Sequence, residues 1–175
     1  MLLPRTPGSY ALVLASAITA RIIVGRLGVL KLQPGHYVYV GSVFGPGGLR
    51  ARIEHHQHRV EHPHWHIDYL RRYTRLIWVW YCSGARCEHS WATQLRAISG
   101  ATVPMPGFGS SDCQCDAHLF WLVNGPRDFP GLFPQPGLEP KNLRLTVAAA
   151  SFTAGCCDCL PCAETTCLQG SGPRS

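Results

Sequence analysis

Hydrophobic residues recur at two different spacings along the first two thirds of the chain. Near the start, four short runs rich in β-branched and aromatic residues favour β-strands. These runs cover residues 10–14, 21–24, 27–32 and 36–41. Turn residues such as Pro34 and Gly35 separate them. We therefore expect the four runs to form an antiparallel meander.

A helical spacing replaces the strand pattern after the glycine-rich segment 45–48. Apolar residues at positions 49, 53 and 60 share one face of a helix predicted over residues 49–59, and Arg52 and His56 fall on that same face. A polar side chain within an apolar stripe needs a partner or must line a cleft. The later pattern predicts a helix, a buried strand, a second helix and a last strand over residues 64–73, 76–81, 87–98 and 118–123.

The composition changes after residue 123. The last 52 residues hold seven of the 14 Pro and five of the nine Cys, and periodicity fades there apart from a run at 143–150. This composition favours a poorly ordered segment. We predict one folded α+β domain over residues 1–123 and a Pro- and Cys-rich, disordered tail over residues 124–175. Closely spaced cysteines in the tail could chelate a metal, but a second paired knuckle is missing; they include Cys156, Cys159 and Cys162.

Positive charge is concentrated in the predicted domain. Residues 1–123 contain 12 Lys and Arg against six Asp and Glu, whereas the tail is neutral. Eleven of the 12 cations are Arg, whose planar guanidinium suits phosphate recognition. A polyanionic partner such as DNA explains this excess, and so does a basic, solvated surface.

The sequence gives no sign of membrane insertion or secretion. No apolar run reaches the roughly 18 residues of a membrane-spanning helix, so no membrane partner is expected. The apolar run at 10–15 is interrupted at its start by Pro7 and Gly8, and it falls short of a secretory signal core of roughly 7–15 residues. We expect a cytoplasmic protein, and the odd number of nine Cys argues against a disulfide framework.

Three segments carry a motif in a fixed order. Gly8-Ser9-Tyr10 opens the first strand, Tyr39-Val40-Gly41 closes the fourth, and Arg52 follows on the first helix. This pattern resembles the GIY-YIG nuclease superfamily. Further segments resemble one of its branches, the domain-of-unknown-function 123 family, which occurs alone or fused to endonuclease III-type glycosylases. These segments are Tyr37–Ser42, Gly47-Gly48-Leu49, 64–70, 107–115 and His118-Leu119.

The resemblance implies a fold and a set of site residues. It implies a small GIY-YIG-like α+β domain with a central antiparallel three-stranded sheet flanked by helices. The 29 residues from Tyr10 to Tyr39 leave room for an additional strand pair. By motif position, these are the paired tyrosines and Arg52 is the motif arginine. A glutamate on a later helix holds the metal in this superfamily; Glu88 is our candidate, with Asp68 as the rival carboxylate.

The implied activity is divalent-metal-dependent hydrolysis of DNA phosphodiester bonds in repair or processing, with Mg²⁺ or Mn²⁺ as cofactor. A tyrosine with a lowered pKa could act as the general base, and an arginine could pair with phosphate oxygens as charge builds. A single glutamate could suffice for Mg²⁺, which keeps several waters. A base-excision glycosylase is the implied protein partner. The residues expected to contact DNA are Arg50, His56, Arg59, Arg71, Arg72 and Arg75.

Histidine and cysteine are dense enough to indicate a second kind of metal. Six of the nine His lie between positions 55 and 66, and Cys113, Cys115 and His118 form a Cys-x-Cys-x-x-His string. Nitrogen and sulfur ligands suit zinc, and zinc binding has been suggested for the family that this chain resembles. The string supplies at most three ligands, so a full zinc site would also need one of three others. These are His64, His66 and Cys82.

Three functions therefore remain open from the sequence. The first is a DNA endonuclease, and the second is a non-catalytic nucleic-acid-binding accessory module. The third is a zinc-stabilised structural or protein-interaction domain, in which the metal would support the fold. The alternative to any zinc site is a polar histidine surface near phosphates with Cys113 and Cys115 as buried thiols.

Overall fold

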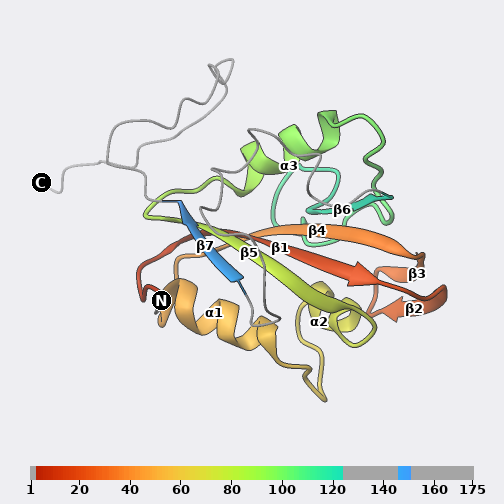
Figure 1. Ribbon diagram of the computed structural model, residues 1–175, viewed down its shortest axis with the longest axis horizontal. Helices are drawn as coiled ribbons and strands as arrows, with labels where there is room; N and C mark the ends of the chain where they lie inside the picture. Colours follow the sequence, from red (N-terminus) through yellow and green to blue (C-terminus); the bar gives the residue numbers. More distant parts are fainter. Residues whose placement is uncertain (1–2, 124–145, 151–175) are drawn as a thin grey trace, which may run out of the picture.

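The computed structural model describes residues 3–123 and 146–150 (Figure 1). Its central sheet has the strand order β6-β4-β1-β5-β7. The neighbours among β6, β4, β1 and β5 are antiparallel, and β7 runs parallel to β5. The bounds are β1 (Gly8–Ser16), β4 (Gly35–Val43), β5 (Arg75–Ser83), β6 (Leu119–Leu122) and β7 (Thr146–Ala150). The predicted α+β class is confirmed, with a mostly antiparallel sheet at its centre.

A separate two-stranded sheet fills the interval between β1 and β4. It consists of β2 (Ala20–Val24) and β3 (Gly28–Leu32), and β2 packs against α2 (His66–Arg71). The predicted additional strand pair is therefore present. The predicted meander is wrong, because β1 pairs with β4 and β5 rather than with β2. The chain leaves the central sheet after β1 and returns to it at β4.

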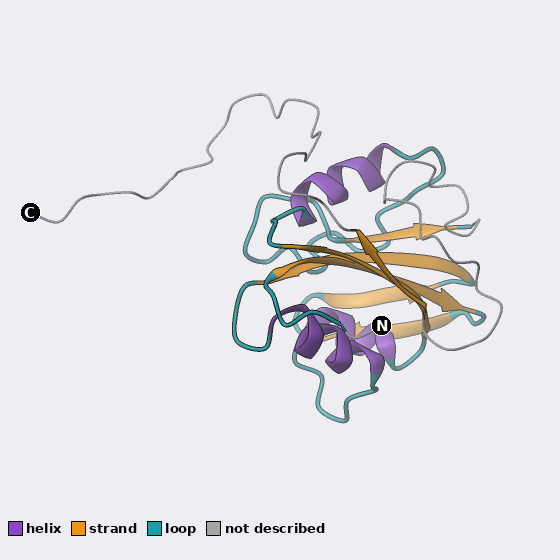
Figure 2. Cartoon of the chain, turned by 60° about the vertical axis from the view of Figure 1, so that its left-hand side comes forward, coloured by secondary structure: helices purple, strands orange, loops and turns teal. Residues whose placement is uncertain are grey.

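Helices cover both faces of the central sheet (Figures 1 and 2). Helix α1 (Gly48–Gln57) lies with α2 on one face, and α3 (Glu88–Ala97) lies on the other. Alternation along β1 produces this arrangement, since Tyr10 and Leu12 enter the core on the α1 side while Ala11 and Val13 pack toward α3. Both faces of β1 are thus buried, and β1 is the central strand of the domain.

Helix α2 is shorter at both ends than the helix predicted over residues 64–73. The buried Asp68 carboxylate explains where it begins. Asp68 Oδ2 accepts hydrogen bonds from the backbone N–H groups of His64, at 3.0 Å, and Trp65, at 2.9 Å. These bonds hold the two residues in an extended turn ahead of the helix.

The predicted tail lies outside the described residues, apart from β7, which falls within the run at 143–150. The tail cysteines also lie outside the described residues. No helix in the described ranges has the length and apolarity needed to span a bilayer. Residues 3–123 contain four cysteines, Cys82, Cys87, Cys113 and Cys115, and the last two are free thiols.

Candidate active site

A polar pocket of about 480 Å³ opens where β1 and β4 pair. Strand β6 pairs with β4 only over His36–Tyr39. The end of β4 that follows Tyr39 therefore borders the pocket. Tyr39 and Gly41 face the α1 side there, and Ser42 faces the α3 side. Side chains from both faces of the sheet therefore reach one space. The lining also includes residues of α1, α3 and the loops before α2 and β6.

The two motif tyrosines lie on the α1 side of the pocket, with their ring centroids 6.4 Å apart. Tyr10 on β1 lies opposite Gly41 on β4. A Cβ atom at position 41 would lie 2.7 Å from the Tyr10 hydroxyl, so only glycine leaves room for the phenol. Gly109 plays the same part for Tyr39, because its φ is +75° and a Cβ atom there would lie 2.7 Å from the Tyr39 ring.

Behind Tyr10, two buried side chains form a polar chain with it. The Tyr10 hydroxyl lies 3.0 Å from His56 Nε2, and His56 Nδ1 lies 3.9 Å from Asp68 Oδ1. Burial lowers the pKa of His56 to about 3, although the Asp68 charge opposes the shift. The imidazole is therefore neutral at pH 7, and with its proton on Nδ1 it can accept a hydrogen bond from Tyr10 at Nε2.

Burial raises the pKa of Tyr10 to about 12, and the nearby Arg52 charge opposes that rise. Burial and the neighbouring Tyr10 also raise the pKa of Tyr39 well above its ordinary value. Both phenols consequently keep their protons at neutral pH. The expectation of a tyrosine with a lowered pKa is wrong for this structure, because desolvation outweighs the positive charge of Arg52.

Arg52, a polar residue on an apolar helix face, both has a partner and lines the pocket. Its guanidinium lies over the Trp65 ring, 4.1 Å from the ring centroid, in a cation–π contact. It also lines the pocket. The side chain is only partly buried, so its planar donors are held in position and remain accessible from the pocket.

Glu88 enters the pocket from the first turn of α3 and is only 4% exposed. Ser42 Oγ donates to Oε1 at 2.8 Å, and Ser9 Oγ donates to Oε2 at 2.9 Å. Burial alone would raise the pKa of this carboxyl group. Hydrogen bonds from its own backbone N–H and from Ser42 and Ser9 outweigh burial and lower the pKa. Glu88 is therefore an anchored carboxylate at neutral pH.

Two of the pocket residues that the sequence reasoning missed lie close to Glu88 along the chain. Arg86 lies over the Phe44 ring, 3.8 Å from its centroid, with Nη1 3.8 Å from Glu88 Oε1. His89 follows Glu88 in the first turn of α3 and also lines the pocket. Their position in the sequence was the available signal. Both lie within two residues of Glu88, so they are near the same end of α3.

The described residues contain two groups of side chains able to hold a metal ion. One group is His89, Cys113, Cys115 and His118, and the other is His55, His56 and Asp68. In each, the ligand atoms lie within 4.8 Å of one another. Burial raises the pKa of the Cys115 thiol to about 11, and the neighbouring Cys113 adds to the rise. Without a bound cation, this thiol is therefore protonated at neutral pH.

Three members of the predicted zinc set come together, but the fourth side chain beside them is His89. His64 and His66 line the pocket outside this group. His66 instead accepts a hydrogen bond from Gly109 N–H at Nδ1, 3.0 Å away. Cys82 lies in the core between the sheet and α3. The fourth ligand predicted from the sequence is thus replaced by a residue from a different element.

A model of one protein family, described as Domain of unknown function DUF123, matches residues 9–128. The chain belongs to this family. Comparisons with curated proteins and with solved structures gave no match. All of the residues that line the pocket fall inside the matched span. The pocket is therefore built entirely by the DUF123 domain.

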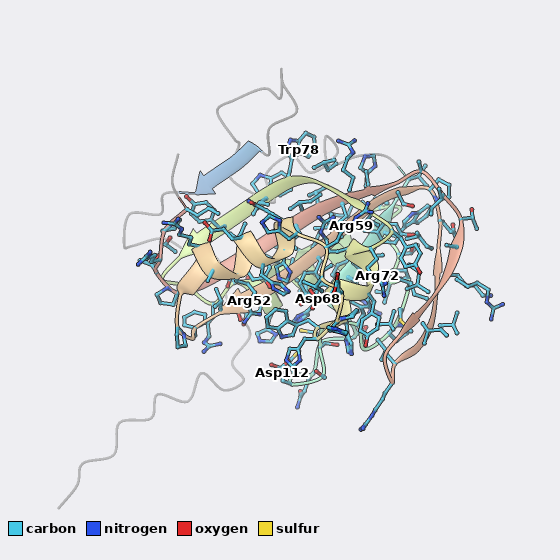
Figure 3. The ribbon with its side chains drawn as sticks, turned by 90° about the horizontal axis from the view of Figure 1, so that it is seen from below. Arg52, Arg59, Asp68, Arg72, Trp78 and Asp112 are labelled. Atoms are coloured by element: carbon cyan, nitrogen blue, oxygen red, sulfur yellow. The ribbon has the colours of Figure 1, made fainter. Side chains whose placement is uncertain are left out.

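The arginines predicted to contact DNA occupy different environments in the DUF123 domain. Arg59, Arg72 and Arg75 are exposed, and the first two lie on the side that carries α1 and α2 (Figure 3). Arg50 is partly exposed and pairs with Glu54 at 2.9 Å. These four side chains remain available to a polyanion, although none of them lines the pocket.

Two of the predicted DNA contacts are buried in the DUF123 domain. Arg71 is 6% exposed, and it donates from Nε to the His56 carbonyl and from Nη1 to the Thr74 carbonyl, both at 2.8 Å. It thereby satisfies one carbonyl group at the end of α1 and one in the turn between α2 and β5. His56 is 1% exposed and faces Tyr10. Neither side chain is therefore exposed for contact with DNA, and His56 lies behind Tyr10 at the pocket.

Asp68, the rival metal carboxylate, does not line the pocket of the DUF123 domain. Its Oδ2 accepts the two backbone N–H groups ahead of α2, and its Oδ1 lies 3.1 Å from His55 Nε2. Both oxygens are thus used inside the fold. Among the two carboxylates that the sequence offered, Glu88 is the one that faces the pocket.

Proposed function

We propose that this DUF123 domain is a metal-dependent DNA endonuclease of the GIY-YIG type. One observation carries the proposal: Tyr10, Tyr39, Arg52 and Glu88 line the same pocket. They come from β1, β4, α1 and α3, so the fold alone brings them together. The pocket thus combines hydroxyl groups, fixed positive charge and an anchored carboxylate, which are the groups that phosphodiester hydrolysis uses.

Tyr10 and His56 have the geometry to remove a proton from the attacking water. The water oxygen forms a bond to phosphorus, and the bond from phosphorus to the leaving sugar oxygen breaks. Tyr10 is too weakly acidic to ionise at pH 7. In the proposed step its oxygen accepts the proton of the water while its own proton passes to His56 Nε2 at 3.0 Å. The Asp68 carboxylate, 3.9 Å from His56 Nδ1, offsets part of the cost of charging this buried imidazole. A proton from solvent completes the leaving group.

Arg52, Arg86 and Tyr39 have roles on the phosphate. The two guanidinium groups neutralise nonbridging oxygens as negative charge builds on them. The raised pKa of Tyr39 keeps its phenol protonated, so it can donate a hydrogen bond to the same oxygens. Stacking on Trp65 and on Phe44 orients the two guanidinium groups before substrate arrives.

The resemblance to GIY-YIG nucleases implies a Mg²⁺ or Mn²⁺ ion, and Glu88 fits as its ligand. The carboxylate has a lowered pKa, two serine hydroxyls fix its orientation, and Asp112 lies in the same pocket wall. Few protein oxygens are needed, because Mg²⁺ retains several waters. When bound, such an ion supplies a positive charge that polarises the phosphate.

The test is cleavage of supercoiled, nicked and branched DNA with Mg²⁺ or Mn²⁺. Arg52→Ala and Glu88→Gln should each lower the rate by about 10²–10³-fold, as expected for loss of one transition-state contact. Arg21→Ala and Glu54→Gln remove the same charges at exposed positions outside the pocket and should cleave like wild type. Thermal melting checks that all four variants fold.

Equal cleavage by Arg52→Ala and wild type, with both folded, contradicts the assigned site. Absence of cleavage by the wild type on every DNA, together with salt-sensitive binding, contradicts catalysis. That result supports the accessory nucleic-acid-binding module instead. Absence of both cleavage and binding contradicts any function on DNA.

A further inference from the structure

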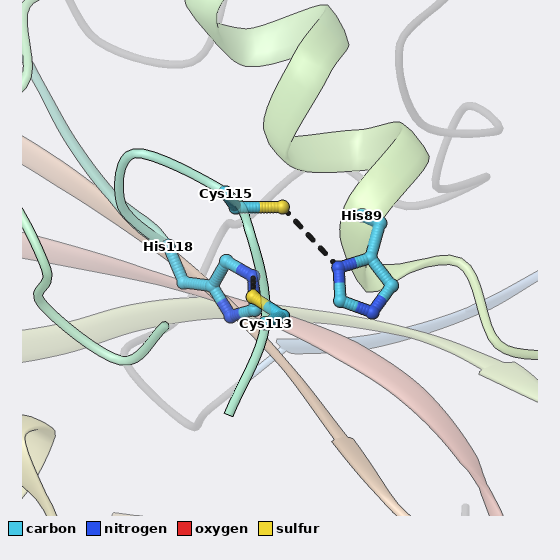
Figure 4. A group of neighbouring side chains, drawn as sticks. All are labelled: His89, Cys113, Cys115 and His118. Atoms are coloured by element: carbon cyan, nitrogen blue, oxygen red, sulfur yellow. Dashed lines mark hydrogen bonds between the residues drawn. The ribbon is translucent and has the colours of Figure 1, made fainter. Parts of the chain in front are cut away.

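A cluster of two thiols and two imidazoles joins α3 to the loop before β6. His89 lies in the first turn of α3, Cys113 and Cys115 lie in the loop, and His118 directly precedes β6 (Figure 4). His89 Nδ1 is 3.2 Å from Cys115 Sγ, and His118 Nε2 is 3.4 Å from Cys113 Sγ. Each imidazole nitrogen therefore faces a sulfur atom.

These distances match the edges of a tetrahedral metal site. Zinc binds thiolate sulfur at about 2.3 Å and imidazole nitrogen at about 2.0–2.1 Å, which places sulfur and nitrogen about 3.5 Å apart across a tetrahedron. The two sulfur–nitrogen distances already lie near this value, and all four ligand atoms lie within 4.8 Å of one another. We infer that His89, Cys113, Cys115 and His118 form a Cys₂His₂ site for Zn²⁺.

The surroundings of the cluster support a metal rather than four independent side chains. His89 Nε2, the ring nitrogen that does not face sulfur, lies 3.8 Å from Glu88 Oε1. A carboxylate near the second nitrogen of a histidine is a usual outer-shell partner of zinc ligands. Two thiolates and two neutral imidazoles also balance the charge of the ion. The set is chemically suited to zinc, since sulfur and imidazole ligands select it over Mg²⁺.

Backbone hydrogen bonds and the buried Phe108 hold the loop against the domain, and the metal would add a direct link to α3. Residues 98–118 contain neither a helix nor a strand, apart from the single bridge of Thr102 to Trp121. An ion pair between Arg96 and Asp116 also joins α3 to this loop, but both side chains are 59% exposed. An exposed pair of this kind contributes little. The four-ligand site fixes the loop directly to the start of α3, beside Glu88.

Three of the four ligands, His89, Cys113 and His118, also line the candidate active-site pocket. The zinc assignment nevertheless does not depend on nuclease activity. Metal analysis of the full chain, purified without added metal or chelator, should find about one zinc per chain. Because the tail cysteines could also bind metal, a double variant is needed as the matched control. Cys156→Ser with Cys159→Ser should retain the zinc, whereas Cys113→Ser with Cys115→Ser should lose it.

Ligand type is tested by replacing zinc with Co²⁺, whose absorption spectrum reports the number of bound thiolates. The wild type should show two, and His89→Cys should retain the metal with three. His89→Gln changes a side chain that is 52% exposed, so its fold is not at risk from a buried cavity. It should weaken zinc binding by more than the roughly 10–100-fold expected for loss of an outer-shell partner.

Three results would overturn the assignment. The first is less than about half a zinc per wild-type chain. The second is zinc that is lost only when the tail cysteines are changed. The third is a cobalt spectrum that His89→Cys leaves unaltered. Each of these results is a metal measurement made without DNA, so failure of the zinc site and failure of the nuclease proposal are distinguishable.

Discussion

Tyr10 and His56 form a buried contact between two titratable side chains. Burial raises the pKa of Tyr10 and lowers the pKa of His56. Both side chains are therefore neutral in the folded protein at pH 7. The unfolded chain places His56 in water, where its pKa returns to about 6.5. Folding is therefore coupled to the loss of a proton from this histidine in weakly acidic solution.

This coupling predicts how the free energy of unfolding depends on pH. Between the folded pKa of about 3 and the ordinary pKa of 6.5, the unfolded chain binds a proton at His56 that the folded chain does not. The contribution of His56 is fully present above about pH 6.5 and is lost as pH falls toward 3. Urea unfolding between about pH 4 and 5.5 should show a slope that His56→Gln reduces by about 1.4 kcal/mol per pH unit.

His62→Gln is the matched control, because His62 lies in an exposed turn and its loss removes the same kind of side chain. A slope that is the same for wild type and His56→Gln would contradict the neutral buried imidazole.

At the scale of residues, motif position located Tyr10, Tyr39, Arg52 and Glu88, and the structure brings them into one pocket. Whether a given polar side chain is buried, and which groups it then binds, was harder to predict. Arg71 resembles the other arginines in sequence, but one of the carbonyl groups that it satisfies belongs to His56 in α1, fifteen residues earlier. A single sequence does not show which carbonyl groups a fold leaves without partners.

Gly41 on β4 lies opposite Tyr10 on β1 and leaves space for the Tyr10 phenol. Gly41→Ala should displace the Tyr10 phenol, because the new Cβ atom would lie 2.7 Å from its hydroxyl. We expect a loss of about 1–3 kcal/mol in stability, as for other overpacked sites. On the nuclease proposal, cleavage should fall up to about 10²-fold, since a 1 Å misplacement of a reacting group has that effect.

Gly45→Ala provides the control, because a Cβ atom there meets nothing within 4 Å. Chemical denaturation and DNA cleavage measured on both variants test the idea. Equal stability of the two variants would show that the Tyr10 ring moves without resistance.

At the scale of elements, hydrophobic spacing located the strands and helices of residues 8–122 with shifts of a few residues at their ends. It did not predict which strands are neighbours. Alternation shows which face of a strand is apolar, but β1 and β2 both have an apolar face and lie in different sheets. The long interval before Tyr39 carried the useful information, because it left room for an additional pair of strands.

For the molecule as a whole, the basic excess predicts salt-dependent binding to DNA. Exposed Arg59 and Arg72 lie on the side that carries α1 and α2. If each neutralises one phosphate, Arg59→Ala and Arg72→Ala should each reduce the slope of log K against log salt by about 1. Fluorescence anisotropy with labelled duplex DNA from about 50 to 200 mM salt measures this slope, over the range in which phosphate contacts respond strongly.

Arg21→Ala removes an equal charge from the β2–β3 sheet and should leave the slope unchanged. Identical slopes for wild type, Arg59→Ala and Arg72→Ala would exclude the α1–α2 side as the phosphate-binding surface.

The central position of β1 also has a consequence for the synthesis of the chain. Strand β1 is made first, but its two neighbours, β4 and β5, begin only at Gly35 and Arg75. At roughly 5–20 residues per second, the ribosome takes several seconds to supply both. During that interval an apolar strand with two unpaired edges is open to pairing with other chains. The nascent chain is therefore most vulnerable to aggregation before β5 leaves the ribosome, and slower translation of residues 17–83 would lengthen that period.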